Sequence, residues 1–167
     1  MTGTLPPGIR QPSGVRGLFV LGRVVQGARV ASGLSLSNPY GGGTIALQRP
    51  FFERDGLDFS SYHMGTVNVD IAPLSFSLRQ AKYTFRSIPW AQGFPPEDFS
   101  LSPVALFARG ARYTGLLYYP HPGTKIGFHK TPTVMEIIAP FIDGLSYGDD
   151  VRLSLSSSEV ALAGRFV

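Results

Sequence analysis

Hydrophobic and polar residues alternate along several short stretches of the chain, which is the pattern of half-buried β-strands. The clearest stretch, residues 63–71, reads HMGTVNVDI. A strand here would bury Val67, Val69 and Ile71 on one face, because successive side chains point to opposite sides. Its other face would carry three oxygen-bearing side chains, those of Thr66, Asn68 and Asp70. Such groups suit solvent, and they also suit a site for a hard cation.

The same alternation, together with turn residues, predicts that most of the remaining chain forms short strands. Residues 103–110 and 111–120 are expected to pair as a hairpin that turns at Gly110. A short helix is expected within residues 49–59, ending near Gly56, and a proline-rich loop at residues 91–100. Further strands are predicted at residues 17–30, 44–47, 75–90, 133–140 and 151–155. Roughly seven or eight short strands favour a mainly β fold, a single small closed or nearly closed β-barrel with one or two short helices.

Length and composition predict one domain. The chain has 167 residues, of which 43% are hydrophobic and 16% charged, enough for one well-buried core and too few for two ordinary domains. The first residues are rich in proline and glycine with little to bury, so residues 1–16 are expected to be a flexible tail. The domain is then expected to span residues 17–167.

Cysteine content and charge exclude some classes of site and leave others open. With no cysteine, the chain has no disulfide, no thiolate metal site and no cysteine nucleophile. The net charge of +4 is spread singly along the chain, which permits contact with phosphates or nucleic acid without requiring either. No apolar run is long enough to cross a bilayer, so we expect a soluble, cytoplasmic protein without a membrane partner.

Several segments together resemble the family of CTP-dependent, archaeal-type riboflavin kinases, which are built on a small cradle-loop β-barrel. They are GRVVQG near the start, YHMGTVNVDI in the middle, and GLLYYP followed by VMEIIAP and GDDV. The resemblance implies transfer of the terminal phosphate of CTP, or of another nucleoside triphosphate, to riboflavin, which yields FMN. It also implies Mg²⁺ as cofactor.

The resemblance assigns roles to particular residues. Thr66 and Asn68 match the threonine and asparagine of the family's G-T-x-N motif, which hold Mg²⁺. Glu136 matches the acid beside the flavin's ribityl chain and would act as the catalytic base. Backbone amides of a glycine-rich stretch would contact the nucleotide, and a threonine upstream of the acid would contact the flavin. The candidates for these binding roles are Gly27, Gly41, Gly42, Gly43, Thr44 and Thr131.

Each of these residues also has an ordinary structural explanation. Thr66 and Asn68 could be solvent-facing strand residues, and Glu136 an outward-facing carboxylate. The three glycines lack the Lys-Ser/Thr ending of a P-loop and do not precede a clear helix, which favours a permissive loop. Tyr118 and Tyr119 could sandwich a flavin ring with Trp90 and Phe94, but aromatic residues mostly form core.

Two other functions therefore stay open. The first is a non-catalytic barrel that binds flavin or a nucleotide. Residues 141–150, FIDGLSYGDD, are acidic where the family carries a longer segment with a nucleotide-binding arginine, which favours this alternative. The second is a barrel that binds nucleic acid; here the dispersed charges and the lack of a visible basic-aromatic strip argue against it.

Overall fold

A computed structural model describes residues 17–27, 43–124 and 133–164, so the expected tail at residues 1–16 lies outside the described residues. The described part is mainly β, with one helix and nine strands in chain order. The elements are β1 (Gly17–Val24), α1 (Thr44–Arg54), β2 (Val67–Asp70), β3 (Ser75–Leu78), β4 (Tyr83–Ile88), β5 (Glu97–Ala108), β6 (Ala111–Pro120), β7 (Val134–Ile138), β8 (Asp150–Ser156) and β9 (Val160–Ala163).

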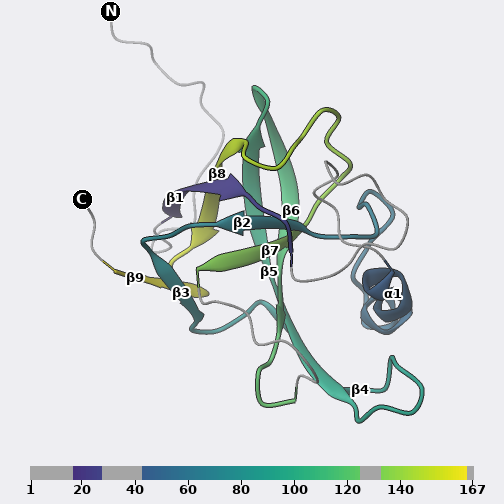
Figure 1. The fold of residues 1–167 in the computed structure, drawn as a ribbon. Coiled ribbons are helices and arrows are strands. Elements are labelled where there is room, and N and C mark those ends of the chain that lie inside the picture. The colour runs from purple at the N-terminus through teal and green to yellow at the C-terminus, as the bar shows by residue number, and fades with distance from the viewer. Residues whose placement is uncertain (1–16, 28–42, 125–132, 165–167) are drawn as a thin grey trace, which may run out of the picture.

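Six of the strands form a ring-like antiparallel sheet. The strand order is β4-β5-β6-β7-β2-β1-β8, and an additional pairing between β5 and β8 brings the sheet back onto itself (Figure 1). β4 extends from β5 outside the ring, and β3 pairs with β9 in a separate two-stranded sheet. This arrangement is consistent with the barrel-like fold expected from the sequence.

The predicted β5–β6 hairpin is confirmed. Ala108 pairs with Ala111, so only Arg109 and Gly110 form the turn. Both have positive φ, 48° and 76°, which is the backbone of a type I′ turn. β5 begins six residues earlier than the predicted strand, at Glu97, because Glu97, Phe99 and the residues that follow are buried between neighbouring strands.

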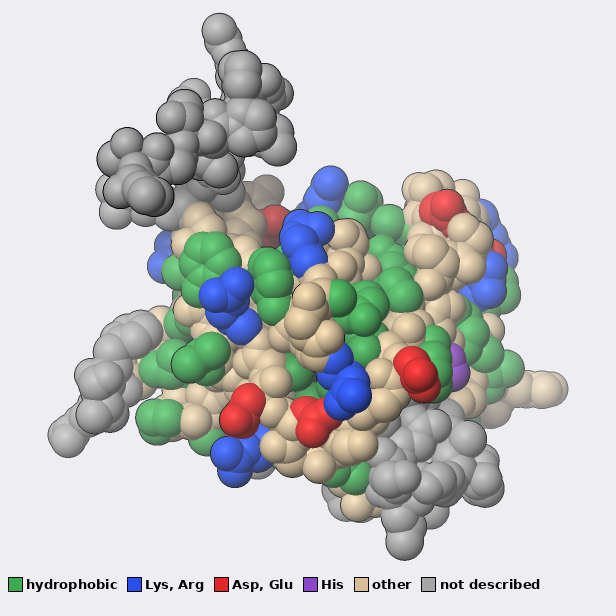
Figure 2. Space-filling model, turned by 90° about the horizontal axis from the view of Figure 1, so that it is seen from above, with side chains coloured by type: hydrophobic (Ala, Val, Ile, Leu, Met, Phe, Trp, Pro, Cys, Tyr) green, Lys and Arg blue, Asp and Glu red, His purple; other side chains and the backbone are tan. Residues whose placement is uncertain are grey.

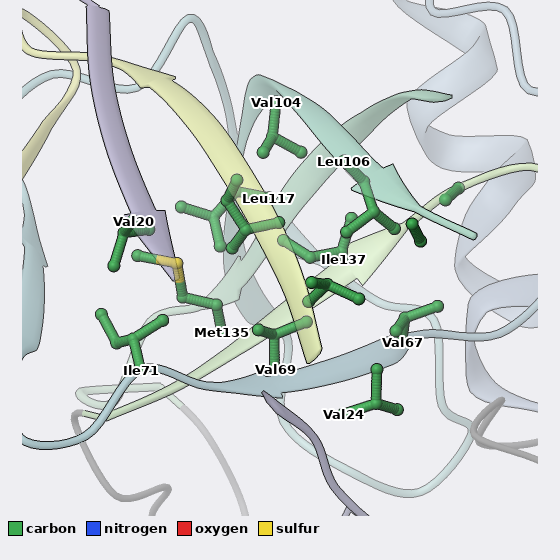
Figure 3. Packing of buried hydrophobic residues seen from close by; sticks show 14 of the residues in the cluster. Val20, Val24, Val67, Val69, Ile71, Val104, Leu106, Leu117, Met135 and Ile137 are labelled. Atoms are coloured by element: carbon green, nitrogen blue, oxygen red, sulfur yellow. The ribbon is translucent and has the colours of Figure 1, made fainter. Parts of the chain in front are cut away.

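The interior of the ring is an apolar core formed by alternate residues of each strand. Val67, Val69 and Ile71 are at most 1% exposed, as the alternation of residues 63–71 predicts. Met135 and Ile137 of β7 are equally buried and point into the same space (Figure 3). Their alternate neighbours on β2 and β7 must therefore point out of this core.

A second apolar cluster lies where α1 packs on the sheet. Ile45 and Phe52 of the helix join Phe99, Leu116 and other residues of β4 to β7. The prediction of a strand at residues 44–47 is therefore wrong, and the predicted helix begins earlier and ends at Arg54. The helix keeps Pro50 in its interior, although a proline there removes one backbone hydrogen bond and costs about 3 kcal/mol. Burial against the sheet offsets that cost.

Within the described residues, no helix is long and apolar enough to span a membrane.

Candidate functional site

Three polar side chains lie side by side across the sheet, on the face opposite the apolar core inside the ring. Asn68 of β2 is the direct cross-strand partner of Glu136 on β7, and Glu136 is in turn the partner of Tyr118 on β6. Directly opposed residues share one face, with Cβ atoms about 4.5–5.5 Å apart. The sheet thus brings together the candidate metal ligand Asn68 and the candidate base Glu136, which come from separate motifs. We call Asn68, Glu136 and Tyr118 the polar row.

The polar row is covered rather than exposed to solvent. Asn68 is 3% exposed and Thr66, immediately before β2, is 7% exposed, so neither is a solvent-facing strand residue. Glu136 is half-buried, and its Oε2 atom is fully buried. Buried polar groups need partners or ligands, because desolvation without them costs free energy. Burial thus excludes the solvent-facing explanation for Thr66 and Asn68.

Asp70 plays a different part from Thr66 and Asn68. It is half-buried, and its Oδ1 accepts a hydrogen bond from the backbone N–H of Ala72 at 2.9 Å. That bond shapes the turn that follows β2. Asp70 therefore has a local structural role at the end of the strand.

Gly27 allows the chain after β1 to lie directly against Asn68. The backbone N–H of Val25 donates to the Asn68 carbonyl at 2.9 Å, which carries the β1 chain past the polar row. A Cβ added at Gly27 would lie 2.7 Å from Asn68 Nδ2 and 3.1 Å from Cγ. Real Cβ atoms essentially never come so close, so any larger residue at this position would displace the Asn68 side chain. One glycine named from the sequence therefore contacts one of the named metal ligands.

Helix α1 lies over the other end of the polar row. The Tyr118 hydroxyl donates a buried hydrogen bond of 2.7 Å to Gln48 Oε1 on the helix, and Gln48 is 2% exposed. Gln48 is not among the residues predicted from the sequence, because the pattern of residues 44–47 predicts a strand. The spacing of Ile45, Gln48 and Phe52 is the helical signal that could have located it.

The glycine run stands directly before this helix, contrary to the expectation that it precedes no clear helix. Gly43 is the N-cap residue, with φ of 80° and no side-chain cap, and Thr44 is the first helical residue. The first backbone N–H groups of a helix have no partner within it, and they favour anions such as phosphate. Gly41, Gly42 and Thr131 lie outside the described residues.

The aromatic residues proposed as a flavin sandwich do not face one another. Tyr118 stacks on Phe99 in the cluster beneath α1, with ring centroids 5.7 Å apart. Tyr119 points to the opposite face, where its ring meets Phe76 and His121. Trp90 donates to Glu97 Oε2 at 2.6 Å and is held by that bond. Alternation along β6 separates the two tyrosines, so this arrangement cannot clamp one ring system.

The described histidines have structural contacts of their own. The backbone N–H of His63 donates to the Ala139 carbonyl at 2.9 Å, and burial lowers the pKa of the His63 side chain. His121 Nε2 lies 2.7 Å from Ser100 Oγ, and burial also lowers the pKa of His121. Among the described residues there is no group of three or more histidine, aspartate or glutamate side chains that could hold a metal.

The donor set near the polar row nevertheless fits Mg²⁺. A threonine hydroxyl and an asparagine amide supply the oxygen atoms that this ion prefers, and the ion commonly takes one or two protein ligands and completes its shell with phosphate and water. Thr66 and Asn68 offer this pair on buried positions two residues apart. Comparison of the sequence with protein-family models and with curated proteins finds no match.

Proposed function

We propose that this chain is a riboflavin kinase-like phosphotransferase, which transfers the terminal phosphate of CTP or of another nucleoside triphosphate to riboflavin and yields FMN. The observation that carries the proposal is the direct pairing of Asn68 with Glu136 on one covered face. Two motifs far apart in the sequence suggested these residues separately, and strand pairing makes them neighbours. On this proposal the ring-like sheet is a cradle-loop β-barrel of the riboflavin kinase type.

The charge of the triphosphate would be neutralised by a metal ion and by backbone amides. The Thr66 hydroxyl and the Asn68 amide oxygen would hold Mg²⁺, which when bound neutralises phosphate charge. Gly27 would keep the Asn68 amide in one position, because the chain lies against it. The free backbone N–H groups at the start of α1, beside Gly43, would hold phosphate oxygens.

Proton transfer would take place at Glu136. Its carboxylate would accept the proton of the primary ribityl hydroxyl as that oxygen bonds to the terminal phosphorus of the nucleotide. The bond between this phosphorus and its bridging oxygen breaks, and the nucleoside diphosphate leaves. Phosphoryl transfer depends mostly on positioning and charge stabilisation, so one base and a few fixed donors suffice.

The proposal is tested first by binding and then by turnover. Riboflavin, CTP and ATP are titrated by calorimetry with and without Mg²⁺, and each pair that binds is assayed for FMN. We expect Glu136→Gln to lower kcat by about 10²- to 10⁴-fold with little change in riboflavin affinity. Asn68→Ala should abolish Mg²⁺-dependent turnover, whereas Asn68→Asp keeps an oxygen ligand and should retain it. Asp70→Asn, on the same strand, is the matched control and should leave turnover unchanged.

One alternative is favoured by a specific observation. Residues 141–150 contain no lysine or arginine where the resembled family carries a nucleotide-binding arginine. If riboflavin binds but no nucleoside triphosphate supports FMN formation, the chain is a non-catalytic flavin-binding protein and the kinase proposal is wrong. If riboflavin and both nucleotides fail to bind at all, both functions are excluded.

A further inference from the structure

Strand pairing builds a row of alternating apolar and basic side chains on the outer face of β1, β8, β5 and β6. Leu21 is the partner of Arg152, Arg152 of Phe107, and Phe107 of Arg112. Phe19 lies two residues before Leu21 on the same face of β1. We call these five residues the phenylalanine-arginine row. Its members come from both ends and the middle of the sequence, so no linear motif contains them.

Arg152 is held at the centre of the row by two aromatic rings. Its guanidinium carbon lies 4.5 Å from the centroid of the Phe107 ring and 5.6 Å from that of Phe19. Cation–π contact holds the planar guanidinium without covering the row, because Phe19 is still 65% exposed and Leu21 is 76% exposed. Exposed apolar side chains gathered in this way mark interaction surfaces.

The charge of this face is positive. Arg152 and Arg112 are both exposed, and Arg23 on β1 adds a third guanidinium, which pairs with the carboxylate of Asp150. The Arg23–Asp150 pair is exposed, so solvent screening makes it weak. Figure 2, which views the molecule from above Figure 1, shows a face on which hydrophobic and basic side chains are interspersed, with acidic ones at scattered positions. The face thus suits an anionic partner that also offers flat apolar groups.

We propose that the phenylalanine-arginine row binds single-stranded nucleic acid. Bases would stack on the exposed Phe19 ring and on the guanidinium plane of Arg152, while Arg112 and Arg23 would pair with phosphates. Exposed aromatic side chains on an open sheet are a recurring platform for unpaired bases. A second copy of this chain is a poorer occupant, because a two-fold interface would place these arginines against their own copies. This activity is separate from the proposed kinase site.

The test is fluorescence anisotropy with a labelled single strand of about 16 nucleotides, as RNA and as DNA, over a series of salt concentrations. Loss of stacking in Phe19→Ala should weaken binding by about 5- to 100-fold. Arg152→Lys keeps the positive charge but removes the planar guanidinium on which a base would stack. It should therefore weaken binding without changing the salt dependence. Arg112→Ala should reduce the slope of log K against log salt by about 0.7. Phe94→Ala is the matched control, an exposed phenylalanine outside the row, and should have no effect.

Several outcomes would overturn the proposal. Absence of binding, or binding that is unchanged in both Phe19→Ala and Arg152→Lys, would show that the row does not stack bases. If a duplex bound as tightly as the single strand, or if polyglutamate competed as well as unlabelled single strand, the row would be attracting anions in general and would not be recognising unpaired bases. Self-association in sedimentation that Phe19→Ala abolishes, without any nucleic-acid binding, would make a second copy the occupant. Thermal unfolding of each variant confirms that the fold is intact, as the exposure of Phe19 leads us to expect.

Discussion

Replacing Gly27 with alanine tests whether the chain after β1 is packed against the polar row. The added Cβ would lie 2.7 Å from Asn68 Nδ2, 3.1 Å from Cγ and 3.3 Å from Oδ1. The Asn68 amide would have to move by about 0.7 Å to reach ordinary contact at 3.4 Å. Asn68 is only 3% exposed, so little free space is available to it. Overpacking of this kind costs about 1–3 kcal/mol of unfolding free energy.

Urea denaturation followed by the fluorescence of Trp90, the only tryptophan, measures that loss. The same loss should lower Tm by about 2–12 °C for a chain of this length. Gly123→Ala is the control, because no atom of the described residues lies within 4 Å of a Cβ added at Gly123. Its unfolding free energy should stay within about 0.5 kcal/mol of the parent value.

A double-mutant cycle then identifies Asn68 as the cause. All three of the nearest atoms to the new Cβ belong to the Asn68 side chain, and Asn68→Ala removes them. Gly27→Ala should therefore cost almost nothing in the Asn68→Ala background, which gives a coupling of about 1–3 kcal/mol. An equal loss of stability in both backgrounds would refute the reasoning, since the two residues would then not be in contact.

Two further predictions concern stability. Tyr118→Phe should lower the free energy of unfolding by about 1–3 kcal/mol, because it removes the hydrogen bond to the buried Gln48 Oε1. Adding Gln48→Leu to this variant should restore most of the lost stability. Equal urea midpoints for the parent and Tyr118→Phe would contradict the prediction. Burial lowers the pKa of His121, so the unfolded state binds its proton more readily. The associated stability is therefore complete above pH 6.5 and is lost as the pH falls below that value. His121→Gln, which can keep a hydrogen bond to Ser100, should flatten the pH dependence of Tm below 6.5, and an unchanged profile would rule out this residue as the source.

The errors of the sequence-based prediction have specific physical causes. Residues 44–47 are short, apolar and partly β-branched, so their local pattern fits a strand or a helix equally well. The helix forms because Ile45, Gln48 and Phe52 share one side and pack on the sheet. Tyr118 and Tyr119 are adjacent in sequence, yet alternation along β6 sends them to opposite faces. Propensity alone could not decide the first case, whereas the strand predicted at residues 111–120 already implied the second through its alternation.

The sequence by itself determined the local features of this protein. Alternation identified Val67, Val69 and Ile71 as core, and a glycine between two apolar runs located the β5–β6 hairpin. Neither feature depends on a distant part of the chain, because the period of a strand and the backbone freedom of glycine are local properties.

Only the tertiary structure decided which distant residues became neighbours. The pairing of Asn68 with Glu136 follows from the register between β2 and β7, and the contact of Arg152 with Phe107 follows from the register between β8 and β5. A shift of one residue in either register would move a side chain to the other face of the sheet. Burial of the core face fixes those registers, so the polar row and the phenylalanine-arginine row exist only once the whole ring has formed.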